Sequence, residues 1–305
     1  MAHLRLGLSV AVVFYLPHLI AQRLGAFRDE GVTVEFVTSY GQQWALLQSG
    51  AVDVAIGGRT LANSLDADSG SRNVIFCGAL RANPWFVIGR PATRPFEWND
   101  LVGKTLLGLP DFPQAICLRW ILLQHGIDAQ QVTVRSCGDM DAELRAFRAG
   151  EGDYLLHSLH SAAPMIAAGE AMLLQELATP TGFVPWSIYA ARLDVMRKRR
   201  AEFEAFTRAI AKALRWIATS PAEAVAALLA PYYPEWTHAS LTGLIATYQP
   251  LGIWPADPLI PRAEWEHYNA IYQATGLEKL SVRYDDYVDS SLAEQANASM
   301  GNGTS

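Results

Sequence analysis

The sequence has few cysteines and no long apolar run, and each shortage argues against a class of protein. Its 305 residues include three cysteines, Cys77, Cys117 and Cys137, which form neither a CxxC pair nor a Cys/His zinc spacing. Cys117 and Cys137 could form a disulfide in an oxidising compartment, but three small buried hydrophobic side chains are the simpler interpretation. No apolar run reaches the roughly 18 residues that a membrane-spanning helix needs, so we expect no membrane span.

Basic charge is scarce as well. There are 24 Lys and Arg against 30 Asp and Glu, a net charge of −6, and none of the lysines precedes Lys104. The one basic run, residues 197–200, is more typical of a solvated helix end than of a nucleic-acid surface. Half of the residues are hydrophobic, which excludes collagen, coiled coil and wholesale disorder. We expect a globular protein of one large or two ordinary domains, with no nucleic-acid partner.

The first twenty residues permit two interpretations. A charged start followed by the apolar stretch 6–16 superficially resembles a secretory leader. However, Arg5 is flanked by Leu4 and Leu6, the stretch first alternates like a strand, and no clear cleavage site follows. We interpret residues 4–9 as a strand that runs into a loop and a helix from about Leu16. The protein is then expected to be periplasmic if a leader has been removed, and cytoplasmic if Met1 is the native start.

Short strand patterns alternate with helical patterns along the first half of the chain, which predicts parallel βαβ units. Residues 46–55 and 146–155 align without a gap: in each, an amphipathic helix ends at glycine and an acidic residue opens a strand. This repeat predicts two lobes built from one unit. From Leu193 onward the pattern is mostly helical. We expect residues 1–82 and 188–289 to form lobe 1, residues 83–187 to form lobe 2, and residues 290–305 to be a disordered tail.

Three segments resemble a known family. Residues 24–35 are similar to its "GYFKEEGLDVE" segment, residues 47–55 to "LxSGxVDxA" and residues 100–105 to "DLKGK". These resemble the periplasmic solute-binding proteins of the sulfonate, nitrate and thiamine-pyrimidine type, the NMT1/THI5-like group, over about residues 4–230. The resemblance implies an α/β, two-lobed type II periplasmic-binding-protein fold, in which each lobe is a mostly parallel sheet flanked by helices, with a helical C-terminal region.

The function that this resemblance implies is that of the substrate-binding component of an ABC transporter. A small aromatic, heteroaromatic or sulfonate- or carboxylate-bearing ligand would lie between the lobes, and an ABC transporter permease would be the protein partner. We expect a monomer without a cofactor or a metal. The family resemblance does not by itself identify the ligand.

Candidate ligand-binding residues follow from the strand ends. In parallel α/β sheets, ligands lie beyond the carboxyl ends of the strands, near helix N-termini. Aromatic rings are frequent in these loops and in the two crossings between lobes, and they suit a planar or apolar ligand, although tryptophans also fill cores. The predicted ligand-binding residues are Ser9, Phe14, Tyr15, Ser39, Tyr40, Gly58, Arg59, Thr60, Trp85, Asp111, Phe112, His157 and Trp186.

Several of these residues have a second interpretation. Arg59 could clamp a carboxylate or sulfonate, or it could be a surface arginine paired with Asp66 or Asp68. The hydroxyls of Ser9, Ser39 and Thr60 could bind ligand or cap a helix.

The acidic and histidine candidates also have more than one interpretation. Asp111 and Asp139 would accept hydrogen bonds from an amine-bearing ligand, which would then be an aminopyrimidine or similar base. His157 could line the pocket or lie in a solvated turn, and no ligand-spaced carboxylate or cysteine accompanies His157 and His160 to hold a metal.

No motif nominates a catalytic nucleophile, so we do not expect an enzyme. Gly103, Lys104 and Thr105 look like the end of a phosphate-binding loop, but Trp98 occupies the position of the required glycine. An enzyme on the same scaffold is the alternative. Desulfinases of this fold use a first-loop cysteine where this chain has residues 13–15, and the pyrimidine synthase of this fold uses a first-lobe lysine that is absent here. A cytoplasmic ligand sensor is the third possibility.

Overall fold

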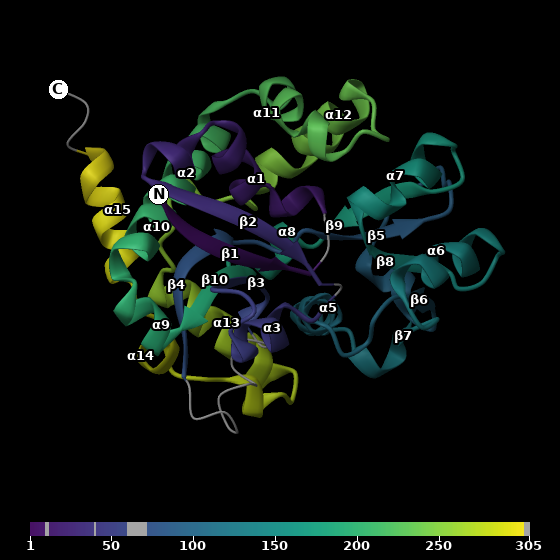
Figure 1. Ribbon diagram of the computed structural model, residues 1–305. Helices are drawn as coiled ribbons and strands as arrows, with labels where there is room; N and C mark the ends of the chain where they lie inside the picture. The colour runs from purple at the N-terminus through teal and green to yellow at the C-terminus, as the bar shows by residue number, and fades with distance from the viewer. Residues whose placement is uncertain (10–11, 40, 60–71, 302–305) are drawn as a thin grey trace. The chain divides into compact units, whose positions relative to one another are not determined.

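The computed structural model describes residues 1–9, 12–39, 41–59 and 72–301 (Figure 1). The chain divides into two compact units. Unit 1 comprises Met1–Arg81, Pro185–Glu266 and Val282–Ser305, and unit 2 comprises Ala82–Val184 and His267–Ser281. Each unit contains one five-stranded sheet flanked by helices, which is the α/β, two-sheet fold expected from the sequence.

The sheet of unit 1 has the order β2-β1-β3-β10-β4. Strands β2, β1 and β3 are parallel, and β10 runs antiparallel to both β3 and β4. In β2 the residues Val32 and Val34 are buried while Thr33 and Glu35 are exposed, so the period-two pattern in the sequence places one face against the core. The strands are β1 (Ala2–Leu8), β2 (Val32–Thr38), β3 (Val54–Gly57), β4 (Asn73–Leu80) and β10 (Ser187–Arg192).

The long helix α10 (Arg200–Thr219) packs against several helices of unit 1, namely α1 (Leu16–Arg23), α2 (Ala26–Asp29), α9 (Leu193–Lys198) and α15 (Ser291–Gly301). Its buried residues recur every three or four positions, and among them Phe206 stacks on Phe27 with 5.4 Å between ring centroids. The other helical elements of unit 1 are η1 (Val13–Tyr15), α3 (Gln43–Ser49), α11 (Ala222–Leu229), η4 (Ala230–Tyr232), α12 (His238–Tyr248), η5 (Gln249–Leu251) and α14 (Tyr284–Tyr287). Helix α13 (Arg262–Ala274) begins in unit 1 and ends in unit 2.

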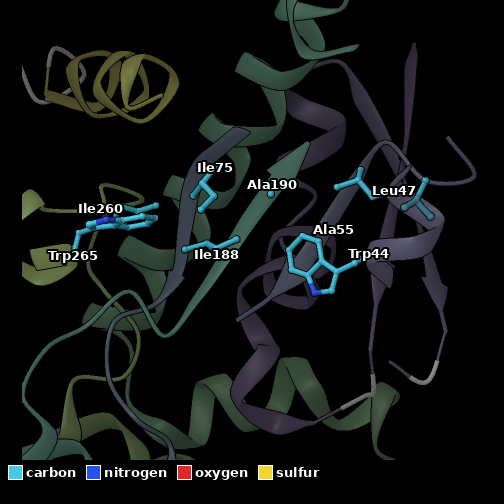
Figure 2. Close-up of a cluster of buried hydrophobic side chains, with 9 residues drawn as sticks. Trp44, Leu47, Ala55, Ile75, Ile188, Ala190, Ile260 and Trp265 are labelled. Atoms are coloured by element: carbon cyan, nitrogen blue, oxygen red, sulfur yellow. The ribbon is translucent and has the colours of Figure 1, made fainter. Parts of the chain in front are cut away.

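One core cluster of unit 1 joins side chains from distant parts of the sequence (Figure 2). Trp44 comes from α3 and Trp265 from α13, and Ile188 of β10 lies between them in this view. The indole of Trp265 donates from Nε1 to the carbonyl oxygen of Val282 at 2.8 Å. This bond fixes the orientation of a large ring in the core, because a buried indole N–H needs an acceptor.

The sheet of unit 2 has the order β7-β6-β8-β5-β9. Strands β7, β6 and β8 are parallel, whereas β5 is antiparallel to β8 and to β9. The strands are β5 (Trp85–Gly89), β6 (Thr105–Leu107), β7 (Thr133–Arg135), β8 (Tyr154–Ser158) and β9 (Met172–Glu176). The helical elements are η2 (Trp98–Leu101), α5 (Pro113–Gln124), η3 (Ala129–Gln131), α6 (Met140–Arg148), α7 (Leu159–Ala167), α8 (Ala178–Thr181) and η6 (Glu278–Leu280).

The sequence repeat corresponds to a structural repeat. Helix α3 is followed by Gly50 at φ +76° and α6 by Gly150 at φ +97°, conformations that favour glycine. Three residues after each glycine, a carboxylate accepts from the backbone N–H of a neighbouring parallel strand. Asp53 Oδ2 accepts from Arg5 N at 2.8 Å, and Asp153 Oδ2 accepts from Thr105 N at 2.9 Å. Asp53 therefore joins the start of β3 to β1, and Asp153 joins the start of β8 to β6 in the same way.

Two expectations about the C-terminal part of the chain differ from the structure. The disorder expected for residues 290–305 is wrong for Ser291–Gly301, which form α15. Leu292, Ala293 and Ala296 of this helix are buried, and α15 packs against α10, so tertiary packing stabilises a segment whose composition is small and polar. Residues 267–281, expected in lobe 1, belong to unit 2, where His267 Nε2 lies 2.7 Å from the carbonyl oxygen of Thr181. No helix within the described ranges is long and apolar enough to cross a membrane.

Candidate functional site

The carboxyl ends of β6, β7 and β8 lie at one edge of the unit 2 sheet, because the three strands are parallel. Strand β5 is antiparallel, so its first residue, Trp85, reaches the same edge and pairs with Ser158 at the end of β8. We call this the carboxyl edge of unit 2. It carries four of the predicted ligand-binding residues, namely Trp85, Asp111, Phe112 and His157.

His157 and Trp85 are in contact at this edge. Their ring centroids are 5.8 Å apart, and both side chains are buried. The Nε2 atom of His157 lies 3.2 Å from the carbonyl oxygen of Met140, in the first turn of α6. Burial lowers the pKa of His157, although the carbonyl groups of Met140 and Ser158 oppose that shift. The imidazole is therefore neutral at pH 7, with its Nε2–H donated to Met140. The interpretation of His157 as part of a solvated turn is wrong.

Glu143 lies beside His157, and the sequence analysis did not identify it. Its Oε2 atom is 4.0 Å from Nε2 of His157, and its side chain is 1% exposed. The pKa of Glu143 is raised to about 7: burial is the main cause and the nearby Asp139 adds to it, while hydrogen bonds from Ser136 and from the backbone of Cys137 oppose the shift. A buried carboxyl group whose pKa is raised to about 7, next to a neutral histidine, is typical of functional sites. The available signal was an acidic residue in the first turn of an amphipathic helix, which usually indicates a solvated face.

Asp111 and Phe112 follow β6 and are both exposed. Phe112 is 50% exposed, a large apolar area to leave in water at the end of a strand. Asp139, the other carboxylate considered in the sequence, caps α6: its Oδ1 accepts from Ala142 N at 2.7 Å. The edge thus combines an exposed aromatic ring, a buried histidine and several carboxylates.

At the corresponding edge of unit 1, three predicted residues, Tyr15, Ser39 and Phe14, have hydrogen-bond partners within the unit. Tyr15 is partly buried, and its hydroxyl accepts from Ser187 Oγ at 3.3 Å. Ser39 donates its hydroxyl to the carbonyl oxygen of Leu8 at 2.9 Å, so it extends the β1–β2 pairing and does not cap a helix. Phe14 is buried, and its carbonyl oxygen accepts from Trp254 Nε1 at 2.8 Å.

The remaining predicted ligand-binding residues of unit 1 are located at strand ends or lie outside the described residues. Ser9 and Gly58 are partly buried and follow β1 and β3, and Trp186 is buried and precedes β10. Tyr40 and Thr60 lie outside the described residues.

Arg59 follows β3 and is completely buried. Its guanidinium carbon is 4.1 Å from the centroid of the Trp265 ring, and Nη1 donates to the carbonyl oxygen of Trp265 at 3.2 Å. The interpretation of Arg59 as a surface residue is wrong, because the cation is stacked on an indole from α13. The proposed pairing partners Asp66 and Asp68 lie outside the described residues.

A cavity of about 440 Å³ lies in unit 2 near the amino ends of β6 and β8, away from the carboxyl edge. Three cations line it, and each has partners. Arg90 donates to the carbonyl oxygens of Phe147 and Gly152 at 3.1 Å, Arg94 pairs with Asp100, and Lys104 Nζ is 3.3 Å from Asp153 Oδ1. Protein groups already bind all three cations, so we do not assign an anion site to this cavity.

The described residues hold no group of three or more His, Cys, Asp or Glu arranged to bind a metal ion. All three cysteines are free, so Cys117 and Cys137 are not bridged. Burial raises the pKa of the Cys77 thiol far above its usual value and that of Cys117 to about 12. Neither thiol is therefore suited to act as a nucleophile.

Two α/β units of this topology define the class of the periplasmic-binding-protein fold. The chain belongs to the family described as NMT1/THI5 like, whose model matches residues 15–224. It is 25% identical over 293 residues to the Bacillus subtilis protein named "Putative binding protein YtlA", a match that covers 94% of this chain and 87% of that one.

Two solved structures show the fold. The periplasmic aliphatic sulphonate binding protein SsuA from Escherichia coli superposes with a TM-score of 0.69 at 18% identity, over 91% of each chain. The desulfurization enzyme DSZB has a TM-score of 0.69 at 15% identity, covering 98% of this chain and 100% of that one. The fold is therefore shared by a binding protein and an enzyme, and it does not choose between these functions.

Proposed function

We propose that this protein is the substrate-binding component of an ABC transporter, and that it binds a small aromatic or heteroaromatic compound or an organic acid without altering it. The observation that carries the proposal is the carboxyl edge of unit 2, where Phe112 is half exposed and Trp85 contacts His157. A flat apolar surface beside a few polar groups is the usual composition of a small-molecule site. Membership of the NMT1/THI5-like family and similarity to proteins named as binding proteins support it.

Binding without chemistry is also supported by the thiols. Catalysis by a cysteine needs a thiolate, and the raised pKa values of Cys77 and Cys117 keep both thiols protonated. The proposal includes delivery to a permease and a periplasmic location if a leader has been removed, and the monomeric state stays a prediction. That one ligand contacts the carboxyl edges of both units stays a prediction from the sequence.

A thermal-shift screen of the purified protein tests the proposal. The panel contains aryl sulfonates, aromatic carboxylates, aromatic amines, aminopyrimidines, alkyl sulfonates and nitrate, each at millimolar concentration. A ligand at about 100 times its Kd adds roughly 2.7 kcal/mol to the free energy of unfolding, which raises Tm by several degrees. We expect one chemical class to raise Tm, and Phe112→Ala to reduce the shift.

The matched control is Leu123→Ala, which removes an exposed apolar side chain from the opposite end of α5. It should leave the shift unchanged. No shift with any class, or an equal loss in both variants, would contradict a ligand site at Phe112.

A further inference from the structure

We propose that Glu143 binds a positively charged, hydrogen-bond-donating group on the ligand, so that the protein takes an aromatic ammonium or amidinium compound and not a sulfonate. This inference rests on the proposed function and names the chemical class of its ligand. It comes from the charges and the unmet hydrogen bond at the carboxyl edge of unit 2.

The side chain of Glu143 has an unmet hydrogen bond. Its Oε1 atom is buried and has no hydrogen-bond partner among the described residues. An acceptor left without a donor in the interior costs free energy, about 1–3 kcal/mol, and more when it is charged. Such a cost persists where a bound group supplies the missing donor. The Oε1 atom of Glu143 can therefore accept a hydrogen bond from an N–H group of a ligand.

Glu143 also lacks a cationic partner. Within 4.0 Å, the described residues offer only the imidazole of His157 as a basic group. That imidazole is neutral at pH 7, because burial lowers its pKa, and its Nε2 lies at hydrogen-bond distance from Met140 O. A buried carboxylate without a counter-ion is costly, and either a proton or a paired cation can remove that cost. A ligand ammonium would provide that charge.

The surroundings of Glu143 are negative. Asp139 faces it from the N-cap of α6 and Asp141 faces His157 from the first turn, and both carboxylates are exposed. Asp111 lies in the β6–α5 loop of the same edge and is also exposed. An anionic ligand would meet like charges here, and like charges at close range are unfavourable.

Two arginines on the elements of this edge are already bonded. Arg119 of α5 donates to the carbonyl oxygen of Pro110 at 2.9 Å, and Arg135 at the end of β7 pairs with Glu151 at 2.9 Å. In unit 1, the guanidinium of Arg59 is buried and stacks on the ring of Trp265. The aromatic rings of Trp85 and Phe112 add a further preference for a cation, because the faces of aromatic rings attract positive charge.

The sign of the pH dependence distinguishes the two ligand classes. Glu143 must be ionised to pair with a cation, and its pKa is raised to about 7. Affinity for a cation should therefore rise about tenfold from pH 6 to pH 8. Affinity for an anion should fall over the same range, because protonated Glu143 repels it less.

The experiment measures binding of benzylamine and 4-aminopyridine, which stay protonated from pH 6 to pH 8, and of benzenesulfonate and benzoate. Isothermal titration is run on the wild-type protein at both pH values and on Glu143→Gln at pH 8. We expect the two cations to bind, more tightly at pH 8, and Glu143→Gln to weaken them at least tenfold and to remove the pH dependence. Glu170→Gln, an exposed residue paired with Arg148, is the matched control and should change nothing.

The possible failures are distinguishable. If the anions bind and the cations do not, or if Glu143→Gln binds the cations as tightly as the wild type, the inference is overturned and the proposed function stands. If neither class binds and the broader thermal-shift panel also gives nothing, the proposed function fails and the inference fails with it. Because the pH comparison uses the wild-type protein, it remains decisive even if Glu143→Gln does not fold.

Discussion

The guanidinium of Arg59 stacks on the indole of Trp265 at 4.1 Å and donates to the same residue's carbonyl oxygen. These two residues are 206 positions apart, and together they join the end of β3 to the start of α13 within unit 1. The role of Arg59 as an anion clamp stays a prediction, and the structure shows its cation packed on an indole.

Replacing Arg59 should therefore change stability first. We expect Arg59→Lys to lower the free energy of unfolding by about 1–3 kcal/mol, because an ammonium loses the planar stack and the fixed hydrogen bond. Denaturant unfolding followed by tryptophan fluorescence measures this. Arg28→Lys, at an exposed position in α2, is the control and should lie within about 0.5 kcal/mol of the wild type. Unchanged stability with lost ligand binding would instead support the anion clamp.

Glu143 should make the protein less stable as pH rises. Its pKa is raised from 4.5 to about 7 in the folded state, so the folded protein holds a proton that the unfolded chain releases. That contribution is complete below pH 4.5 and is lost as pH rises through 7, a decrease of about 1–3 kcal/mol. Unfolding experiments at pH 5 and pH 8 should show a smaller decrease in Glu143→Gln. The exposed Glu223→Gln should behave as the wild type, and an identical slope in all three proteins would disprove this assignment.

Two glycines with positive φ should respond differently to alanine. Gly152 has φ +63°, and an added Cβ would lie 2.7 Å from Leu107 Cγ, whereas Gly126 has φ +72° and open space. We expect Gly126→Ala to cost about 1 kcal/mol of backbone strain, and Gly152→Ala about 2–4 kcal/mol because overpacking against β6 is added. Thermal unfolding of both variants compares them directly. Equal costs would show that Leu107 moves freely.

The three cysteines should differ in reactivity. Cys77 and Cys117 are buried with raised pKa values, and Cys137 is partly exposed after β7. Iodoacetamide at pH 8 should label only Cys137 in the native protein and all three after denaturation. Peptide mass spectrometry locates the label. Labelling of Cys77 in the native protein at the rate of Cys137 would revive the enzyme interpretation.

The local fold could be predicted because its signals are local. Glycine after an amphipathic helix and an acidic residue three positions later predicted the α3–β3 and α6–β8 repeats, and the carboxylates of Asp53 and Asp153 explain why those residue types occur there. Helix α15 was missed because its stability comes from packing on α10, which no composition argument contains.

The candidate site was harder to predict for the same reason. Strand ends located its loops, but whether a polar residue there is free or bonded depends on partners that are distant in the sequence. The alternative of Arg59 as a surface residue failed because the sequence does not show that Trp265 packs on it, and Glu143 was overlooked because its first-turn position looks solvated. Both side chains are buried in the structure, whereas a surface position had been considered for Arg59 and a solvated one is usual for a residue placed like Glu143.

The most direct test of the central claim is equilibrium dialysis of the purified protein against the ligand panel, with mass spectrometry of both compartments. The account predicts that one compound accumulates with the protein to about one equivalent and is recovered chemically unchanged. A compound that disappears into a product, or a panel that distributes equally across the membrane, would contradict a solute-binding protein.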